Sequence, residues 1–359
     1  IYGIAIMVIS NPYLNNLSIH FVLVHNVKFR AALSTLPLHR ARFVKMSVIK
    51  FNVDFAEDET LLNNGRESIN EVVNRVPADI KAIRDWLAYQ PHIKAHIEDE
   101  EILMFLRNRK FSLERTKERI DNYYTIRSLL PEFFANRSPD EPIVRMLLKN
   151  GLFIPLNGYD VEGRLVILIR VGAIDPKVVK FEDMFRSTTM LMEILMRKSK
   201  HLQICGITMI EDLQGFSLAH ASLMNLALMK KATYCWQEAF PLRPRSLNYL
   251  HTSPAFDSIF KIMKTFLKEK IKQRMKFYGD NIEALYELVP REILPVEYGG
   301  GGKTCQEISE TWLKVLDENK EWFKVQSSFK VDEKLRVGMP KSSEELFGIV
   351  GSFRTLELD

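Results

Sequence analysis

The chain has 359 residues, of which 46% are hydrophobic and 26% charged, and its formal net charge is +5. This composition is typical of a soluble globular protein and excludes a disordered or collagen-like chain, while the length favours two domains or one large domain with a helical appendage. The three cysteines, Cys205, Cys235 and Cys305, lie far apart without metal-binding spacing, so a disulfide framework or zinc site is not supported and a reducing, cytoplasmic setting is expected.

The first 45 residues differ from the rest of the chain. They contain five basic residues and no acid, and from Met46 onward the sequence is balanced and helix-patterned. We interpret residues 1–45 as an upstream segment that is disordered or not native to the protein. A targeting segment is the alternative, because the apolar run at 4–9 is typical of one, although no basic residue precedes it. No apolar stretch reaches the roughly 18 to 20 residues of a bilayer span, so any membrane contact is expected to be peripheral.

Helical periodicity from Pro77 predicts an N-terminal all-helical domain over residues 46–138. Apolar residues recur at three- and four-residue spacing around Ile83, Leu106 and Ile120, and short breaks at 91–92 and 110–112 separate the pieces. This pattern favours a small helical bundle.

After a linker at 138–142, short β-rich runs alternate with amphipathic stretches. The runs lie at 165–171, 204–210, 246–251 and 275–278, and the amphipathic stretches lie at 181–198, 217–238 and 254–272. Alternation of this kind is typical of a mostly parallel sheet with covering helices. The predicted fold class is therefore α/β, with the second domain at residues 139–302.

Residues 303–359 are expected to form one helix and a tail. Thr304 and Glu307 match a capping box that opens a helix through about Phe323, and the mixed polar sequence beyond it indicates a loose tail. The preceding GGGGKT at 299–304 resembles a phosphate loop, but Glu297 stands where that motif needs glycine. We interpret it as a turn before the helix.

No motif indicates catalysis. The chain has no GxSxG sequence, and His220 and Ser222 lie two apart on a predicted helix, where such neighbours do not face each other, so we expect both on solvated surface. We predict a monomer that is not an enzyme, with no catalytic residue, metal, cofactor or nucleic-acid partner.

Positive charge is concentrated in residues 241–276, which hold nine bases and two acids. The same block contains a helical face formed by Phe256, Ile259, Phe260 and Met263, with lysines on the opposite side. A basic amphipathic helix of this kind suits a membrane interface. The alternative is a helix that packs on the sheet with solvated lysines.

Two features indicate a pocket for an apolar ligand. Methionines are frequent between Met184 and Met229, and their flexible thioethers adapt to irregular ligands, although ordinary core filling is the alternative. Glu211 ends an apolar run, near the sheet edge where ligands usually bind. If buried, its carboxyl needs a hydrogen-bond partner or stays protonated; the alternative is a surface acid in a turn.

Together these segments resemble the CRAL-TRIO family from about Pro77 to Phe323. The motifs are FLRNRKF at 105–111, DPKVVKFEDMFR at 175–186, GITMIEDLQGF at 206–216, FPLRPRSLNYLHTSPAF at 240–256 and ILPVEYGGG at 293–301. The resemblance implies a helical domain and a lipid-binding α/β domain closed by a mobile helix, here 254–267. It also implies intracellular transfer of a tocopherol-, retinoid- or other isoprenoid-like lipid, released at phosphoinositide-containing membranes. A phosphoinositide-responsive adaptor that acts through a protein partner is the alternative.

The resemblance also supplies site residues. The phosphoinositide-binding positions of the family's tocopherol carrier match Arg109, Arg243, Arg245, Lys270 and Arg274. The expected pocket residues are Phe185, Thr188, Met192, Ile207, Met209, Glu211, Trp236, Leu247, Phe256, Ile259, Phe260 and Met263. Trp236 and Met192 differ in bulk from that carrier, and Glu211 matches the retinaldehyde carrier instead, which argues against tocopherol as the ligand.

Overall fold

The computed structural model describes residues 6–8, 19–21, 49–53 and 55–348 of the chain. The chain divides into two units between Lys45 and Met46, and each is described by itself. In the first unit, β1 (Ile6–Val8) pairs antiparallel with β2 (Ile19–Phe21). Our interpretation of residues 1–45 otherwise lies outside the described residues.

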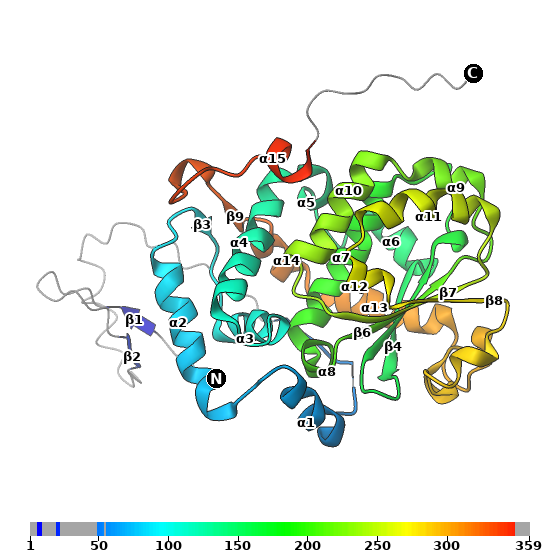
Figure 1. The fold of residues 1–359 in the computed structure, drawn as a ribbon, viewed down its shortest axis with the longest axis horizontal. Helices are drawn as coiled ribbons and strands as arrows, with labels where there is room; N and C mark the ends of the chain where they lie inside the picture. Colours follow the sequence, from blue (N-terminus) through cyan, green and yellow to red (C-terminus); the bar gives the residue numbers. More distant parts are fainter. Residues whose placement is uncertain (1–5, 9–18, 22–48, 54, 349–359) are drawn as a thin grey trace, which may run out of the picture. The chain divides into compact units, whose positions relative to one another are not determined.

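The second unit begins with a helical bundle, as predicted (Figure 1). Its elements are α1 (Glu59–Ser68), the short η3 (Val73–Arg75), α2 (Val76–Ala88), α3 (Asp99–Asn108), α4 (Leu113–Leu129), α5 (Pro131–Phe134) and α6 (Pro142–Lys149). The α3 helix starts at a capping box in which Glu98 and Glu101 cap each other's backbone amides. The apolar faces of α2, α3 and α4 meet at Ile83, Ile102 and Ile120, which are fully buried.

The sheet is mostly parallel, which confirms the predicted fold class. Its strands are β4 (Phe153–Tyr159), β5 (Leu165–Arg170), β6 (Ile207–Asp212), β7 (Pro244–Leu250) and β8 (Met275–Gly279), in that spatial order. Only the β4–β5 pair is antiparallel. The β4 strand was not predicted, because Pro155 and Gly158 obscure its pattern; an edge strand tolerates both residues.

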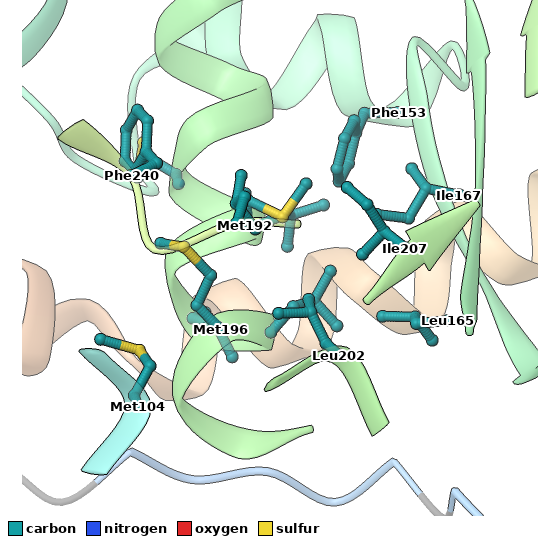
Figure 2. Close-up of a cluster of buried hydrophobic side chains, with 14 of the residues drawn as sticks. Met104, Phe153, Leu165, Ile167, Met192, Met196, Leu202, Ile207 and Phe240 are labelled. Carbon is teal, nitrogen blue, oxygen red and sulfur yellow. The ribbon is translucent and has the colours of Figure 1, made fainter. Parts of the chain in front are cut away.

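Helices cover the sheet and fill the space between it and the bundle (Figure 1). They are α7 (Phe181–Lys198), α8 (Lys200–Ile204), α9 (Leu218–Leu223), α10 (Leu226–Tyr234), the π-helix η5 (Cys235–Ala239), α11 (Pro254–Phe266) and α12 (Glu269–Lys272), with η4 (Val171–Ala173) after β5. Figure 2 shows Met192 and Met196 of α7 between the sheet residues Ile167 and Ile207 and Met104 of α3. One apolar core therefore joins the bundle to the sheet.

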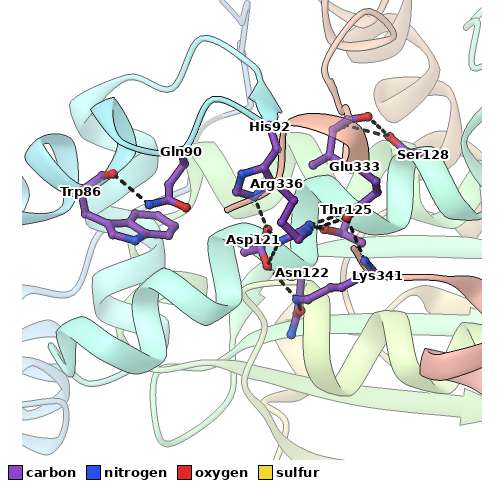
Figure 3. A network of polar contacts seen from close by, with 11 residues as sticks. Trp86, Gln90, His92, Asp121, Asn122, Thr125, Ser128, Glu333, Arg336 and Lys341 are labelled. Carbon is purple, nitrogen blue, oxygen red and sulfur yellow. Dashed lines mark hydrogen bonds and ion pairs between the residues drawn. The ribbon is translucent and has the colours of Figure 1, made fainter. Parts of the chain in front are cut away.

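The C-terminal segment differs from the expected loose tail. Short turns η6 (Glu283–Leu285), η7 (Arg291–Ile293) and η8 (Val296–Tyr298) lead to α13 (Cys305–Glu318), α14 (Lys320–Gln326), β9 (Lys330–Val331), η9 (Glu333–Leu335) and α15 (Ser343–Phe347). The β9 strand pairs with β3 (Ile93–Lys94), and Arg336 Nη1 donates to both carboxylate oxygens of Asp121 at 2.8 Å (Figure 3). The tail is held by ion pairs, which apolar periodicity does not reveal.

The glycine-rich segment before α13 is a turn, as interpreted. The carboxylate of Glu297 accepts from the backbone nitrogen of Cys305 at 2.9 and 3.1 Å, and the Thr304 hydroxyl accepts from Glu307 N at 3.1 Å. The amides at the start of α13 therefore already have protein acceptors. A phosphate would compete there with a carboxylate.

Candidate functional site

A cavity of about 740 Å³ lies among the sheet, α7, α10, α11 and α12, and reaches the junction of α3 and α4. Its size falls in the range of small-molecule sites, which is about 300 to 1,000 Å³. Eight of the twelve expected pocket residues line it: Phe185, Thr188, Ile207, Met209, Glu211, Trp236, Leu247 and Met263.

The other four expected pocket residues lie outside the lining. Met192 is fully buried in the core shared with the bundle. Phe256 is buried against Phe216, Tyr249 and Phe260, and Ile259 and Phe260 are half-buried on α11. The first half of α11 thus covers the sheet, and only its last turns, beginning at Met263, face the cavity.

All five expected phosphoinositide-binding residues line the same cavity. They converge because β6, β7 and β8 are parallel, so that the residues preceding β7 and β8, Arg243 and Arg274, lie at one edge of the sheet. Arg109 reaches this edge from the end of α3. Among the described residues, none of the five forms an ion pair with a carboxylate.

Burial and mutual repulsion act on these cations. Burial, with the nearby charge of Arg245, lowers the pKa of Arg243 to about 10, and the charge of Arg274 followed by burial lowers the pKa of Lys270. An anion at this edge would relieve both effects. We call Arg109, Arg243, Arg245, Lys270 and Arg274 the basic mouth.

Arg119 is a cavity residue that the sequence reasoning missed. It lies on α4 and is buried, with its guanidinium donating to the carbonyls of Phe240 and Gln237. Arg119 lies three residues after Thr116 and four before Tyr123, so it shares the buried face of that helix with them. This spacing could have predicted its burial from the sequence.

Glu211 occupies the opposite end of the cavity. It lies in β6 directly beside Tyr249 of β7, not in the following turn, and both residues line the cavity. No described side chain forms a hydrogen bond or ion pair with its carboxyl, and burial raises its pKa to about 7. The four residue steps from Ile207 to Glu211 separate the two polar ends by about 13 Å.

The helix expected to act as a lid is α11, which begins at the Ser253 cap and Pro254. It packs on the sheet with its lysines exposed, as the alternative interpretation of a packed amphipathic helix expects. At its far end, the Gln237 side chain donates to Phe266 O at 3.0 Å and accepts from Lys268 N at 2.8 Å. At its near end, His251 has a φ of 51° and its Nδ1 lies 2.7 Å from Asp212.

His220 is buried, which corrects the expectation of a solvated surface. Its Nε2 lies 2.8 Å from Ile174 O and its Nδ1 lies 2.8 Å from the Ser217 hydroxyl, so the ring joins α9 to the loop before α7. The residue fills a structural role because both ring nitrogens are used.

In the described part of the chain, no helix combines the length and apolar character that crossing a bilayer requires.

Comparison with known proteins identifies two family models. The CRAL/TRIO domain matches residues 149–300, and the Pinta-like, UBA domain matches residues 72–144. Alpha-tocopherol transfer protein-like from Homo sapiens is 32% identical over 260 residues, covering 72% of this chain and 74% of that protein. Clavesin-1 from Xenopus laevis is 29% identical over 240 residues, covering 67% and 72%. The crystal structure of Sfh5 is 13% identical with a TM-score of 0.40, covering 72% of this chain and 98% of that one.

Proposed function

The chain belongs to the CRAL/TRIO family, whose members bind and transfer lipids, and from this premise we propose that it carries one hydrophobic lipid and releases it at phosphoinositide-containing membranes. The observation that carries the proposal is one cavity with an apolar wall and a basic end, at which none of the five described basic residues forms an ion pair with a carboxylate. We further propose that residues 46–138 form the helical domain, that 139–302 form the lipid domain and that the protein acts as a cytoplasmic monomer without catalysis.

The apolar wall supports retention of the ligand in water. Phe185, Met209, Leu247 and Met263 line the cavity, and removing about 400 Å² of apolar ligand surface from water is worth about 10 kcal/mol at 25 cal/mol per Å². Dissociation into water is therefore slow. The side chains of Glu211 and Tyr249 have no hydrogen-bond partner among the described residues. We expect these two groups to bind a polar atom of the ligand.

The surface beside the lid supports release at a membrane. Leu218 of α9 is 74% exposed, Leu226 of α10 is 55% exposed and Ile262 of α11 is 43% exposed, and the three helices lie together (Figure 1). Exposed apolar side chains next to lysines suit the interface of an anionic bilayer. There, lid residues such as Phe256 and Phe260 exchange their contacts with the sheet for acyl chains.

The test is a charge reversal of Arg245 and Lys270 in the full chain. We expect Arg245→Glu with Lys270→Glu to weaken binding to vesicles containing phosphatidylinositol bisphosphate by tenfold or more, since each basic residue near the surface contributes about 1 kcal/mol. Transfer to those vesicles falls with binding, while loading of the lipid extracted from the purified protein is unchanged.

The matched control reverses two exposed lysines away from the cavity, Lys314 of α13 and Lys324 of α14. Equal transfer by the Arg245/Lys270 variant and the wild type would contradict the proposal. Ligand-dependent capture of a protein partner without lipid transfer would favour the adaptor function instead.

A further inference from the structure

A second cavity lies apart from the one described above, where α4 and α5 meet α14 and β9 (Figure 1). Its volume is about 180 Å³, and it shares no lining residue with the larger cavity. Ala135, Ser327 and Lys330 of its lining are exposed, so the cavity opens at the surface. A cavity of roughly 150 Å³ holds one benzene molecule, so this space suits a small molecule and is too small for a long-chain lipid. We call it the small cavity.

The buried charges beside the small cavity are not balanced. Arg127 and Arg137 both line it, and both pair with one carboxylate, that of Glu193. The neighbouring Arg197 donates to the backbone oxygen of Glu193 at 3.2 Å and pairs with Glu101. Three guanidinium groups therefore share two carboxylates, and each of the five side chains is at most 10% exposed. One positive charge remains without a counterion in this cluster.

Polar atoms of the lining residues also lack partners. The Nε atoms of Arg127 and Arg137 and the Oε1 atom of Gln326 are buried and form no hydrogen bond within the described chain. Lys330 adds a further positive charge, and no acid is found among the described residues of the lining. Buried charges are ordinarily paired, because an unpaired one retains the cost of leaving water. The lining therefore favours an anion.

The rest of the lining is apolar. Phe134 lies beside both guanidinium groups, with its ring centroid 5.3 Å from Cζ of Arg127 and 5.6 Å from Cζ of Arg137. Phe323 lies 5.9 Å from the same atom of Arg137, and Phe329 also lines the cavity. An inorganic anion would supply the missing charge but would leave these rings facing water. An anion with an apolar body meets both parts of the lining.

We propose that the small cavity binds a small carboxylic acid with a body of about the size of a benzene ring. This inference is independent of the proposed carrier function, because the two cavities have separate linings. The carboxylate supplies the missing counterion, since guanidinium groups bind carboxylates through paired, charge-assisted hydrogen bonds. A hydroxyl on the ring would donate to Oε1 of Gln326. Such a ligand would join the helical bundle to the C-terminal segment.

The experiment is a calorimetric titration of the full chain with 4-hydroxybenzoate, with 4-hydroxybenzamide, which has the same shape without the charge, and with inorganic phosphate. We expect the wild type to bind the carboxylate at least about tenfold more tightly than the amide or phosphate. Hydrogen exchange of residues 131–137 and 323–330 should slow when the carboxylate binds, which locates the ligand in the small cavity.

Arg137→Met should lose the preference for the carboxylate over the amide. The variant leaves two guanidinium groups and two carboxylates in the cluster, so we expect it to fold with balanced buried charges. A second variant, Ala135→Leu, changes no charge and fills the exposed rim of the cavity, so it should weaken binding of both the carboxylate and the amide. This variant tests the site even if Arg137→Met does not fold.

The matched control is Arg186→Met. Arg186 also has a buried Nε without a partner, but it is paired with an acid of its own, Asp183, and it lies outside both linings. Its variant should keep the wild-type preference.

Four results would overturn the inference. They are equal affinities of the wild type for the carboxylate and the amide, tighter binding of phosphate than of the carboxylate, an unchanged preference in Arg137→Met, and slowed hydrogen exchange around the larger cavity alone. None of them bears on the carrier function, which is tested by lipid transfer to vesicles.

Discussion

Glu211 is an acid in the wall of an apolar cavity, and no described side chain neutralises it. Burial raises its pKa to about 7 from the ordinary 4.5. The folded protein therefore holds a proton on this carboxyl across a pH range in which the unfolded chain has released it. The free energy of unfolding therefore decreases as the pH rises through this range, and the decrease is complete above about pH 7.

Replacing Glu211 by glutamine removes the titration while keeping the shape of the side chain. We expect Glu211→Gln without ligand to be more stable than the wild type at about pH 8, by up to about 3 kcal/mol, and the difference to shrink toward about pH 5. Denaturant unfolding at several pH values measures this, with the exposed Glu321→Gln as the control. A difference that does not change with pH would show that the carboxyl is solvated.

The same carboxyl is expected to select the ligand. Glu211→Leu replaces the one acidic lining residue by an apolar side chain, so lipids with a polar group at that end lose their hydrogen-bonding partner and bind more weakly, by roughly tenfold. Mass spectrometry of lipid extracted from the wild type and the variant measures the change. An identical lipid composition would exclude Glu211 from ligand selection.

At the scale of elements, the π-helix η5 is bonded to the end of α11, the helix that we propose as the lid. The widened turn of η5 ends where Phe240 N donates to Cys235 O at 2.8 Å, and this segment carries Gln237, which binds the end of α11 through two hydrogen bonds. Opening of the proposed lid would break both bonds and would also separate Phe256 from Tyr249. The Gln237 hydrogen bonds and the ion pair between Lys268 and Glu238 are therefore polar contacts that accompany the apolar ones.

Gln237→Leu should loosen the lid. Two hydrogen bonds of about 1 kcal/mol each are lost, so release of bound lipid to vesicles without phosphoinositide should be about tenfold faster or more. A fluorescent lipid and a quencher in the acceptor vesicles give the rate. Ser258→Ala is the control, because the exposed Ser258 hydroxyl donates to Pro254 O within α11 itself. An unchanged rate would show that the Gln237 hydrogen bonds do not hold the lid closed.

At the scale of the whole molecule, α4 connects the cavity to the C-terminal segment. Arg119 on this helix lines the cavity, and Asp121 two residues later accepts hydrogen bonds from Arg336 and Lys341 and contacts His92 (Figure 3). Further along, Phe347 of α15 packs edge-on against Tyr234 of α10 at 5.2 Å between ring centroids. The C-terminal segment therefore supports two helices that bound the cavity.

Arg336→Met should destabilise the whole second unit. Arg336 is largely buried and is paired with Asp121 and Glu333, and removing one partner of a buried pair costs about 3 kcal/mol or more. Thermal unfolding measures the loss, and limited proteolysis after residue 327 reports release of the segment. The exposed Lys334→Met is the control. Wild-type stability in Arg336→Met would show that the segment packs independently of these ion pairs.

The pH dependence of this network opposes that of Glu211. Burial raises the pKa of Asp121, but the hydrogen bonds from Lys341 and His92 and the charge of Arg336 outweigh burial. The pKa of Asp121 therefore lies below its usual value. This contribution to stability is present above the ordinary pKa of an aspartate and is lost as the pH falls through the lowered one. Acid should therefore release the C-terminal segment before it unfolds the core, as hydrogen exchange of residues 330–347 can measure.

The sequence by itself determined the features that repeat locally. The amphipathic stretch predicted at 181–198 is α7, the apolar face beginning at Phe256 is on α11, and the β-rich runs correspond to four of the five strands of the main sheet. Each depends on the spacing of apolar residues along one element, which is visible without knowing the element's neighbours. Family motifs added the basic mouth, whose members lie on three separate segments.

Only the tertiary structure decided which side chains share a surface. Arg119, the tail ion pairs and the buried ring of His220 depend on contacts with distant segments, and no local spacing specifies a charged side chain's partner. For the same reason Met192 and Met209 look alike in sequence, yet one fills the core and the other lines the cavity. Periodicity reports that a face is buried; what that face meets is set by how the helices and strands pack together.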